Sequence, residues 1–191
     1  MPRMEITEFF SLNAPGNDSY MCASVGKLLI DGVPACVACG YKIDLYFINP
    51  AFRVKRRNYD LSCTYDGYKI ASLKFIEACK RFDLIGLSYL PLPADKDFVV
   101  LKAHSVTRFD AVSRKTHFER LCAVCGKYES VTGAHPVFLL EQPATDLSAT
   151  DIAFGSGNSK SQILLASKFA RTLLAGERLT GLEFERAIGG A

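Results

Sequence analysis

The sequence has no tryptophan and only three histidines, His104, His117 and His135, which are isolated from one another. No serine, aspartate or glutamate near them completes a recognisable nucleophile motif, so we expect surface or locally hydrogen-bonded histidines rather than a catalytic triad. Gly155 and Gly157 lack the following Lys-Ser/Thr pair of a phosphate-binding loop, which favours a flexible turn. These absences argue against an enzyme.

Long apolar runs are missing as well, since none approaches the roughly 20 residues that a membrane-spanning helix needs. Residues 1–20 carry Glu5 and Glu8 and lack a basic segment, so we expect no signal peptide and a cytoplasmic protein. The hydrophobic fraction of 49% and the charged fraction of 23% are ordinary for soluble domains and indicate neither disorder nor a fibrous repeat. The 191 residues suffice for one globular domain, or for two small units that share a core.

Positive charge is only weakly concentrated along the chain. Residues 40–121 hold 15 Lys and Arg against 9 Asp and Glu, whereas the remainder holds 8 against 11. A dedicated nucleic-acid-binding domain usually has a stronger basic stripe. The local cluster of Arg53, Lys55, Arg56 and Arg57 can contact phosphates, but we favour an exposed edge strand on which these charges block unwanted pairing.

Four of the seven cysteines form two patterns of one form, Cys36-Val37-Ala38-Cys39-Gly40 and Cys122-Ala123-Val124-Cys125-Gly126. A Cys-x-x-Cys turn places two thiolates on one metal ion, and the following glycine allows the chain to turn tightly. We therefore predict one zinc site formed by Cys36, Cys39, Cys122 and Cys125. Ordinary buried cysteines and a redox disulfide are the alternatives, although the chain has no Cys-Gly-Pro-Cys centre.

We call the two CxxCG segments knuckles; their nearest cysteines, Cys39 and Cys122, are separated by 82 residues, far more than in a simple zinc ribbon. Zinc would close this long loop and act as a clasp. Because four thiolates leave no open coordination position for water, the predicted zinc is structural. The other cysteines, Cys22, Cys63 and Cys79, are expected to be core thiols.

Turn residues and apolar runs predict a series of short strands and two helices. Phe98–Lys102 and Ser105–Phe109 are expected to form a hairpin or meander, and residues 141–150 a polar loop. The other predicted strands are Leu28–Ile30, Val33–Cys36, Leu45–Ile48, Leu87–Leu92, Phe118–Leu121 and Pro136–Leu140.

Residues 70–87 and 165–182 resemble each other, because each predicts a strand end, a serine cap, an amphipathic helix and a Leu-x-Gly-Leu segment leading into a strand. The caps are Ser72 and Ser167. The resemblance fits either a duplication or two instances of a common helix-to-strand pattern. The apolar helix positions are Leu73, Ile76 and Cys79 in the first unit, and Phe169, Ala170, Leu173 and Leu174 in the second; Leu182 and Phe184 follow as alternating strand residues.

Together these patterns predict an α+β fold: a zinc-ribbon-like double CxxCG clasp with a large insertion, plus two helix-then-strand units packed on antiparallel sheet. We place the zinc-ribbon-like unit at residues 1–141, with its insertion at 40–121. The C-terminal helix-strand unit covers residues 142–191 and packs on it, within what can be one continuous domain.

Four features together resemble a known family. They are the paired CxxCG motifs, Asp151-Ile152-Ala153-Phe154, the helix opening at Ser167 and the ending Leu179-Thr180-Gly181-Leu182-Glu183-Phe184. From about Leu28 to Ile188 the chain resembles the bacterial double-CxxCG motif family. Members look like immunity proteins, encoded beside polymorphic toxins and protecting the producing cell by binding the toxin. The CxxCG pair is the specific part of this resemblance, so only the four cysteines carry over, and no toxin-contacting position is marked by a motif.

The resemblance implies a non-enzymatic protein that forms a heterodimer with a cognate protein toxin, away from membranes. An immunity protein needs a stable scaffold and a complementary surface, which agrees with the lack of catalytic motifs. Exposed acidic residues such as Glu141, Asp146 and Asp151 could face a basic toxin, and the 53–57 cluster an acidic one. The alternative is a nucleic-acid-binding zinc-ribbon protein, disfavoured by the weak positive bias; a metal-dependent enzyme is more remote.

Overall fold

The computed structural model describes residues 8–23 and 29–189. Residues 1–7, the start of the segment on which the signal-peptide expectation rests, lie outside these ranges. Leu28, of the strand predicted at Leu28–Ile30, lies outside them as well. The strands in chain order are β1 (Phe9–Asn13), β2 (Leu61–Cys63), β3 (Lys69–Ser72), β4 (Leu87–Pro91), β5 (Phe98–Ala103), β6 (Val106–Thr107), β7 (His117–Leu121), β8 (Tyr128–Thr132), β9 (Phe138–Leu139), β10 (Leu147–Ser156), β11 (Ser161–Ser167), β12 (Glu183–Arg186) and β13 (Ile188–Gly189). The helices are α1 (Leu73–Arg81), α2 (Ala111–Arg114), α3 (Lys168–Gly176) and the short 3-10 turn η1 (Gly157–Ser159).

Most strand pairs are antiparallel, and they form two main sheets. One has the order β12-β1-β11-β10-β8-β7, with β6 pairing in parallel with β10, and the other has the order β2-β3-β5-β4. A small parallel pair joins β13 to β9. The predicted class, a mixed fold dominated by antiparallel sheet, is therefore confirmed.

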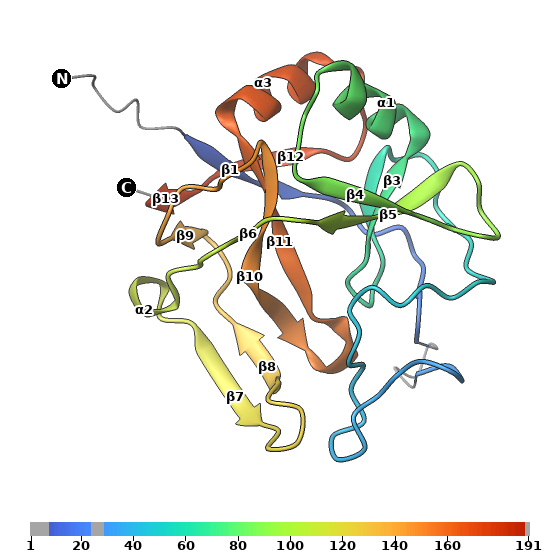
Figure 1. Cartoon of the computed structure of the whole chain (residues 1–191), viewed down its shortest axis with the longest axis vertical. Helices are drawn as coiled ribbons and strands as arrows, with labels where there is room; N and C mark the ends of the chain where they lie inside the picture. Colours follow the sequence, from blue (N-terminus) through green and yellow to red (C-terminus); the bar gives the residue numbers. More distant parts are fainter. Residues whose placement is uncertain (1–7, 24–28, 190–191) are drawn as a thin grey trace.

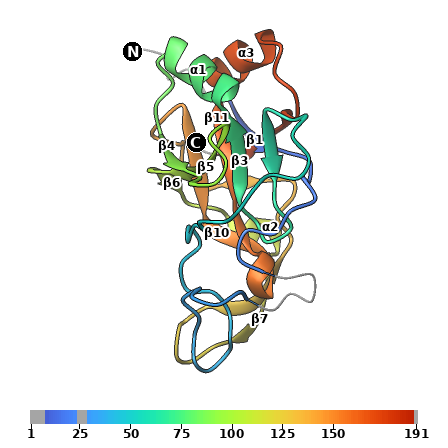
Figure 2. The ribbon, with the colours of Figure 1, turned by 90° about the vertical axis from the view of Figure 1, so that its right-hand side faces the viewer.

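Helices α1 and α3 begin where the serine caps predict them. The Ser72 hydroxyl accepts the N–H of Phe75 (3.2 Å), and the Ser167 hydroxyl accepts the N–H of Ala170 (3.1 Å), which satisfies a free donor in each first turn. The two helices lie side by side at one end of the molecule (Figure 1), as a view turned by 90° also shows (Figure 2). Leu73 and Phe169 are exposed, at 45% and 58%, so the buried faces are narrower than predicted.

The largest hydrophobic cluster joins this helix pair to both main sheets. Its fully buried members include Phe75 and Cys79 of α1, Leu174 of α3 and Leu147 of β10. Burial of large apolar side chains is the main stabilising term in a fold of this size. Two further clusters lie on the other faces: one contains Met21, Cys22 and Phe52, and the other Phe9, Phe109 and Phe154.

Residues 29–30 and 33–36 form no strand and contribute isolated bridges, Leu29 with Ala23 and Ala35 with Lys42. Three further local predictions are wrong. Residues 45–48 form no strand; the side chains of 46–48 pack as a loop against the Met21 cluster. The strands predicted at Phe98–Lys102 and Ser105–Phe109 do not pair, because β6 pairs with β10 instead. The loop predicted at 141–150 ends early, since β10 begins at Leu147. In each case a contact distant in sequence decides the conformation.

The boundary predicted at residue 141 falls between strands that share a sheet. Strand β1 lies between β11 and β12 and pairs with both of them. Residues 142–189 are therefore connected to the N-terminal strand by backbone hydrogen bonds on two sides. Among the described residues, no helix is long and apolar enough to cross a membrane.

Candidate metal centre

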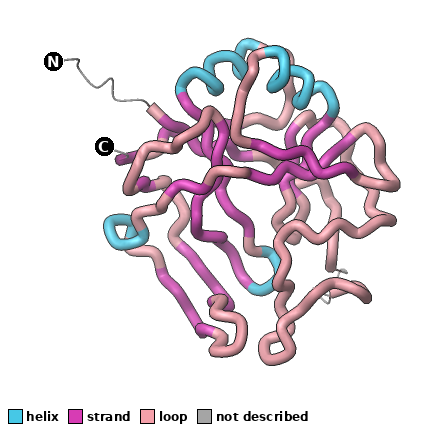
Figure 3. Tube along the Cα trace, viewed as in Figure 1, coloured by secondary structure: helices cyan, strands magenta, loops and turns pink. Residues whose placement is uncertain are grey.

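The two knuckles lie at the end of the molecule opposite the helix pair, in loop segments that come together there (Figure 3). Their backbones make equivalent hydrogen bonds. In the first, Cys36 N donates to Tyr41 O (2.9 Å) and Gly40 N to Cys36 O (2.8 Å). In the second, Cys122 N donates to Lys127 O and Gly126 N to Cys122 O, both at 2.9 Å.

The glycine that follows each Cys-x-x-Cys has a left-handed backbone, with φ of 72° at Gly40 and 68° at Gly126. A Cβ atom at either position would meet nothing within 4 Å. These glycines are thus required by the turn conformation itself and not by a close neighbour.

The four sulfur atoms form one compact cluster. Cys36 Sγ and Cys122 Sγ are 3.8 Å apart, as are Cys39 Sγ and Cys125 Sγ, and all four lie within 4.8 Å of one another. A tetrahedral zinc ion with bonds of about 2.3 Å separates its sulfurs by about 3.8 Å, whereas a disulfide requires about 2.05 Å. All seven cysteines are free thiols, so the cluster has the geometry of a metal site.

Backbone donors favour one thiolate in each knuckle. The N–H groups of Cys125 and Val124 lower the pKa of the Cys122 thiol to about 6, and those of Cys39 and Ala38 lower the pKa of Cys36. For Cys39 the N–H of Tyr41 lowers the pKa, but desolvation and the neighbouring thiols outweigh it and raise the pKa to about 11. Four thiolates at this spacing therefore require a bound cation.

Three lysines link the knuckles to neighbouring segments through main-chain carbonyl groups. Lys127 Nζ donates to Ile43 O, Lys160 Nζ to Tyr128 O, and Lys42 Nζ to Asp66 O (2.6 Å). Lys42 and Lys160 are nearly buried, at 3% and 7% exposure, and burial lowers the pKa of both. Lys160 interacts electrostatically with Cys39 and Cys125, so its positive charge would offset the negative charge of thiolates formed there.

A cavity of about 320 Å³ adjoins the second knuckle. Leu45 lines it on the side of the first knuckle, and Phe118, Val131 and Ile152 line it from the sheet. The walls are mainly apolar, and Asp151 and the three lysines are the charged residues of the lining.

The other residues singled out in the sequence do not join the cysteine cluster. The three histidines are on separate segments: His104 contacts Ser88, His135 contacts Glu185, and His117 lies on β7. Gly155 lies at the end of β10 and Gly157 opens η1. Cys22 and Cys79 are fully buried, and burial raises the pKa of each thiol to about 11, whereas Cys63 is half-buried.

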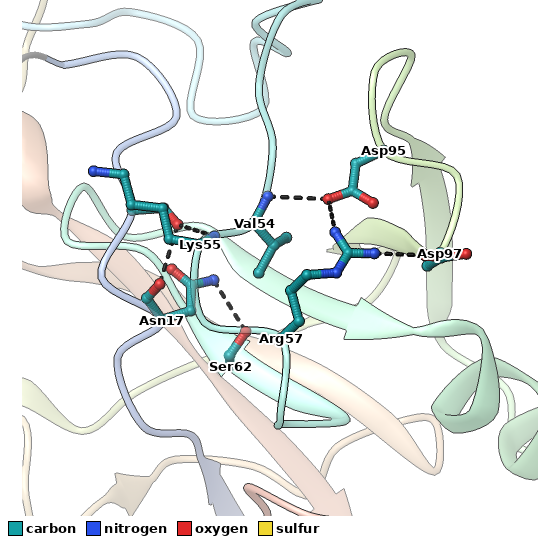
Figure 4. A network of polar contacts seen from close by, with 8 residues as sticks. Asn17, Val54, Lys55, Arg57, Ser62, Asp95 and Asp97 are labelled. Carbon is teal, nitrogen blue, oxygen red and sulfur yellow. Dashed lines mark hydrogen bonds and ion pairs between the residues drawn. The ribbon is translucent and has the colours of Figure 1, made fainter.

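The basic cluster is a loop and not the edge strand that we favoured. Arg57 forms ion pairs with Asp95 (2.6 Å) and Asp97 (2.5 Å), and Asp95 also accepts the N–H of Val54 (Figure 4). Arg56 pairs with Asp18 at 3.6 Å. At least two of the four cations are therefore engaged in holding this loop.

The three acidic residues proposed for a toxin surface also contact the backbone. Asp146 caps α3 through Ser167 and accepts the N–H of Ile85, and Asp151 accepts the N–H of Phe109 at 2.9 Å. Glu141 accepts the N–H of Arg108. Their carboxylates stabilise local structure, which reduces what they can offer to a partner.

Sequence reasoning missed the three lysines, because no spacing rule links Lys42, Lys127 and Lys160 to the cysteines. It also missed Asn158, whose side-chain oxygen accepts the N–H of Lys42 at 2.8 Å. No family model matches this chain, and a search of curated proteins finds no match either.

Proposed function

We propose that the protein is an immunity protein that binds a cognate bacterial toxin in the cytoplasm and neutralises it as a heterodimer. The observation that carries this proposal is the pair of CxxCG knuckles, which the fold brings together into one tetrathiolate cluster. The double CxxCG motif is the feature by which the chain resembles the immunity family. A rigid scaffold without a catalytic role agrees with an inhibitor that acts by occluding the toxin.

We propose further that the bound ion is zinc and that its role is structural. The set of four soft thiolates and the sulfur spacing suit zinc, and no ligand position is left for a reacting water. Iron also accepts four thiolates in tetrahedral geometry, so elemental analysis must decide. Protein purified without added metal should contain about one zinc per chain; a native fold with no metal would refute the proposal.

The test of the immunity function uses the protein encoded immediately upstream of this chain in its source genome. The two proteins should co-purify, and this chain should restore growth to cells that express its neighbour. A matched control is an unrelated immunity protein at equal expression, which should not restore growth. If the pair neither co-purifies nor restores growth, the proposed function is wrong.

Nucleic-acid binding is the alternative that the zinc-ribbon-like motif raises. It predicts binding to DNA or RNA that weakens steeply as salt is added. A gel-shift titration of the metal-loaded protein against both nucleic acids separates the alternatives, because an immunity protein should give no salt-sensitive shift.

A further inference from the structure

The similarity between the two helix-strand units extends over most of the described chain. We infer that the protein consists of two copies of one folding unit, each of which lends its first strand to the other, with the metal site on the axis that relates them. The first repeat is residues 8–91, with β1, the first knuckle, β2, β3, α1 and β4. The second repeat is residues 97–186, with β5, the second knuckle, β10, β11, α3 and β12.

The order of strands is the first observation. The first repeat's sheet is β2-β3-β5-β4, and the matching part of the larger sheet is β10-β11-β1-β12. Each set contains a hairpin, β2-β3 or β10-β11, that leads into a helix. The strand that follows the helix, β4 or β12, is at the other end of the set, and one further strand is inserted between it and the hairpin. The inserted strand comes from the opposite repeat in both cases: β5 in the first sheet and β1 in the second.

The pairing register is the second observation. Ser72 pairs with Phe98 as Ser167 pairs with Phe9, so the inserted strands begin at equivalent positions. A shift by one residue would turn every side chain to the other face, and independent strands have no reason to agree. Three further pairs of the first sheet each have an equivalent in the larger sheet. Tyr89↔Leu101 is equivalent to Phe184↔Leu12, Ser88↔Lys102 to Glu183↔Asn13, and Leu61↔Ala71 to Leu147↔Ala166.

Sequence spacing agrees with the structure. Cys36 and Cys122 are 86 residues apart, as are Cys39 and Cys125, and Asp60 and Asp146 keep the same separation. The hairpin before the helix is longer in the second repeat: Asp60 precedes Ser72 by 12 residues, and Asp146 precedes Ser167 by 21. The spacing from capping serine to the Leu-x-Gly-Leu glycine is then the same in both repeats.

Contacts between the repeats are reciprocal. Thr180 N donates to Asp60 Oδ2 (2.9 Å), and the equivalent Ile85 N donates to Asp146 Oδ2 (3.3 Å). Leu61 N donates to Thr180 O, and Leu147 N donates to Ile85 O. When residue i of one unit contacts residue j of the other, and j contacts i, the units are related by a two-fold axis.

The Leu-x-Gly-Leu glycines lie at these reciprocal contacts. A Cβ on Gly86 would lie 1.7 Å from Leu147 O, and one on Gly181 would lie 2.2 Å from Leu61 O. Each glycine is needed because the backbone of the opposite repeat passes directly against it. A smaller match within each repeat supports their equivalence: Asn17 bonds to Ser62 (Figure 4) as Thr107 bonds to Ser148.

The cysteine cluster lies on this axis. The equivalent pairs Cys36–Cys122 and Cys39–Cys125 have the same sulfur separation, 3.8 Å. Each repeat supplies one knuckle, so neither repeat can form the site alone. The chain has the organisation of a dimer with an exchanged strand and a shared metal, fused end to end.

The test is a circular permutant of the full chain that joins Ala191 to Met1 and opens the exposed turn between Pro93 and Ala94. This exchanges the order of the repeats and leaves each of them continuous. We expect the permutant to bind one zinc per chain and to melt within about 5 °C of the native order, a shift of roughly 1–2 kcal/mol by the usual conversion. The matched control opens the turn between Asp31 and Gly32, inside the first repeat, and should melt lower.

A second measurement tests the inference independently, in case the permutant fails to fold for an unrelated reason. A protease site is inserted between Pro93 and Ala94 of the native-order chain, and the folded, metal-loaded protein is cut there. Because each fragment holds a strand of the other's sheet and half of the metal site, the fragments should remain together during gel filtration and separate in denaturant. Fragments that separate in native buffer, or a between-repeat permutant that is no more stable than its control, would overturn the inference.

Discussion

The two repeats agree closely at the helix end and differ at the metal end. At the helix end, strand order, register and serine caps all match. At the metal end, the second knuckle is at the tip of the β7–β8 hairpin, and β8 pairs with β10. In the first knuckle, the described residues form an isolated bridge between Ala35 and Lys42 and no strand pair. Strand pairing is sparser there, and the lysine contacts and the clustered cysteines connect this segment to its neighbours.

Burial separates the two ends in the same way. The last five residues of β11, beside the helices, are buried, whereas all five residues of β7 are exposed. Val37 and Val124, at the knuckle tips, are 97% and 66% exposed. Hydrophobic burial therefore stabilises the helix end, and under the proposed function ligation of a metal would stabilise the other.

Removing one metal ligand should have the largest effect and should affect the two ends unequally. Cys36→Ser or Cys122→Ser leaves three cysteines in the cluster and uncouples the two knuckles, whose nearest cysteines are separated by 82 residues. We expect loss of zinc and a fall in melting temperature of about 10 °C. Hydrogen exchange should rise around both knuckles while α1 and α3 remain protected.

The control for this experiment is Cys63→Ser, because Cys63 lies outside the cysteine cluster. It should retain zinc and nearly all of the melting temperature. If Cys36→Ser behaves like this control, the metal does not hold the knuckle end together.

At the helix end, the largest effect should come from the two contact glycines. Gly86→Ala and Gly181→Ala each force a Cβ against a main-chain carbonyl of the opposite repeat, and we expect a loss of roughly 3 kcal/mol in the free energy of unfolding. Urea denaturation of the zinc-loaded protein measures this. Gly32→Ala is the control: its φ is also positive, at 84°, but no atom lies within 4 Å, so it should cost only about 1 kcal/mol.

Asp60, which joins the first repeat to the second, should make stability depend on pH. Burial opposes ionisation of Asp60, but the N–H of Thr180 and the hydroxyls of Ser72 and Thr180 outweigh it and lower the pKa of the carboxyl. A lowered pKa stabilises the fold above the unfolded value of about 3.9, and this stability is lost as pH falls through the folded pKa. Asp60→Asn should therefore cost about 1–2 kcal/mol at pH 7 and flatten the acid limb of a stability–pH curve.

Asp146→Asn is the matched variant in the second repeat. The Asp146 carboxylate accepts hydrogen bonds from Ile85 N at 3.3 Å and Ser167 Oγ at 3.4 Å. The equivalent bonds of Asp60, from Thr180 N at 2.9 Å and Ser72 Oγ at 2.7 Å, are shorter. We expect a smaller loss of stability at pH 7. Equal or larger loss from Asp146→Asn would contradict the ranking of the two contacts.

Sequence alone revealed the parts of this molecule that local chemistry determines. The knuckles and both helix caps could be predicted because a CxxCG turn and a serine cap are set by residues within one turn of chain. The exchange of β1 and β5 could not be predicted. Their sequences, FFSLN and FVVLKA, are short and apolar, and nothing in such a strand specifies which sheet receives it.

The candidate metal centre also has a predictable and an unpredictable part. The spacing predicts that its four cysteines come together, but the lysine contacts depend on which carbonyl groups lie nearby in the folded chain. The apolar run at 45–48 predicts a strand, because a run of this length cannot be distinguished from a buried loop by pattern. The lysine contacts and the 45–48 loop could not be predicted for the same reason: both are determined by contacts with residues distant in sequence.

The smallest of these effects should come from Lys160, the nearly buried lysine beside the cysteines. Lys160→Met keeps the apolar stem but removes the bond to Tyr128 O and the charge near Cys39 and Cys125. We expect a loss of about 1 kcal/mol in stability and faster removal of zinc by a chelator, because the thiolates lose a compensating cation. Lys160→Arg keeps the charge and should release zinc at nearly the native rate. If Met and Arg variants release zinc equally, the lysine acts by packing and not by its charge, and stability at the metal end rests on ligation alone.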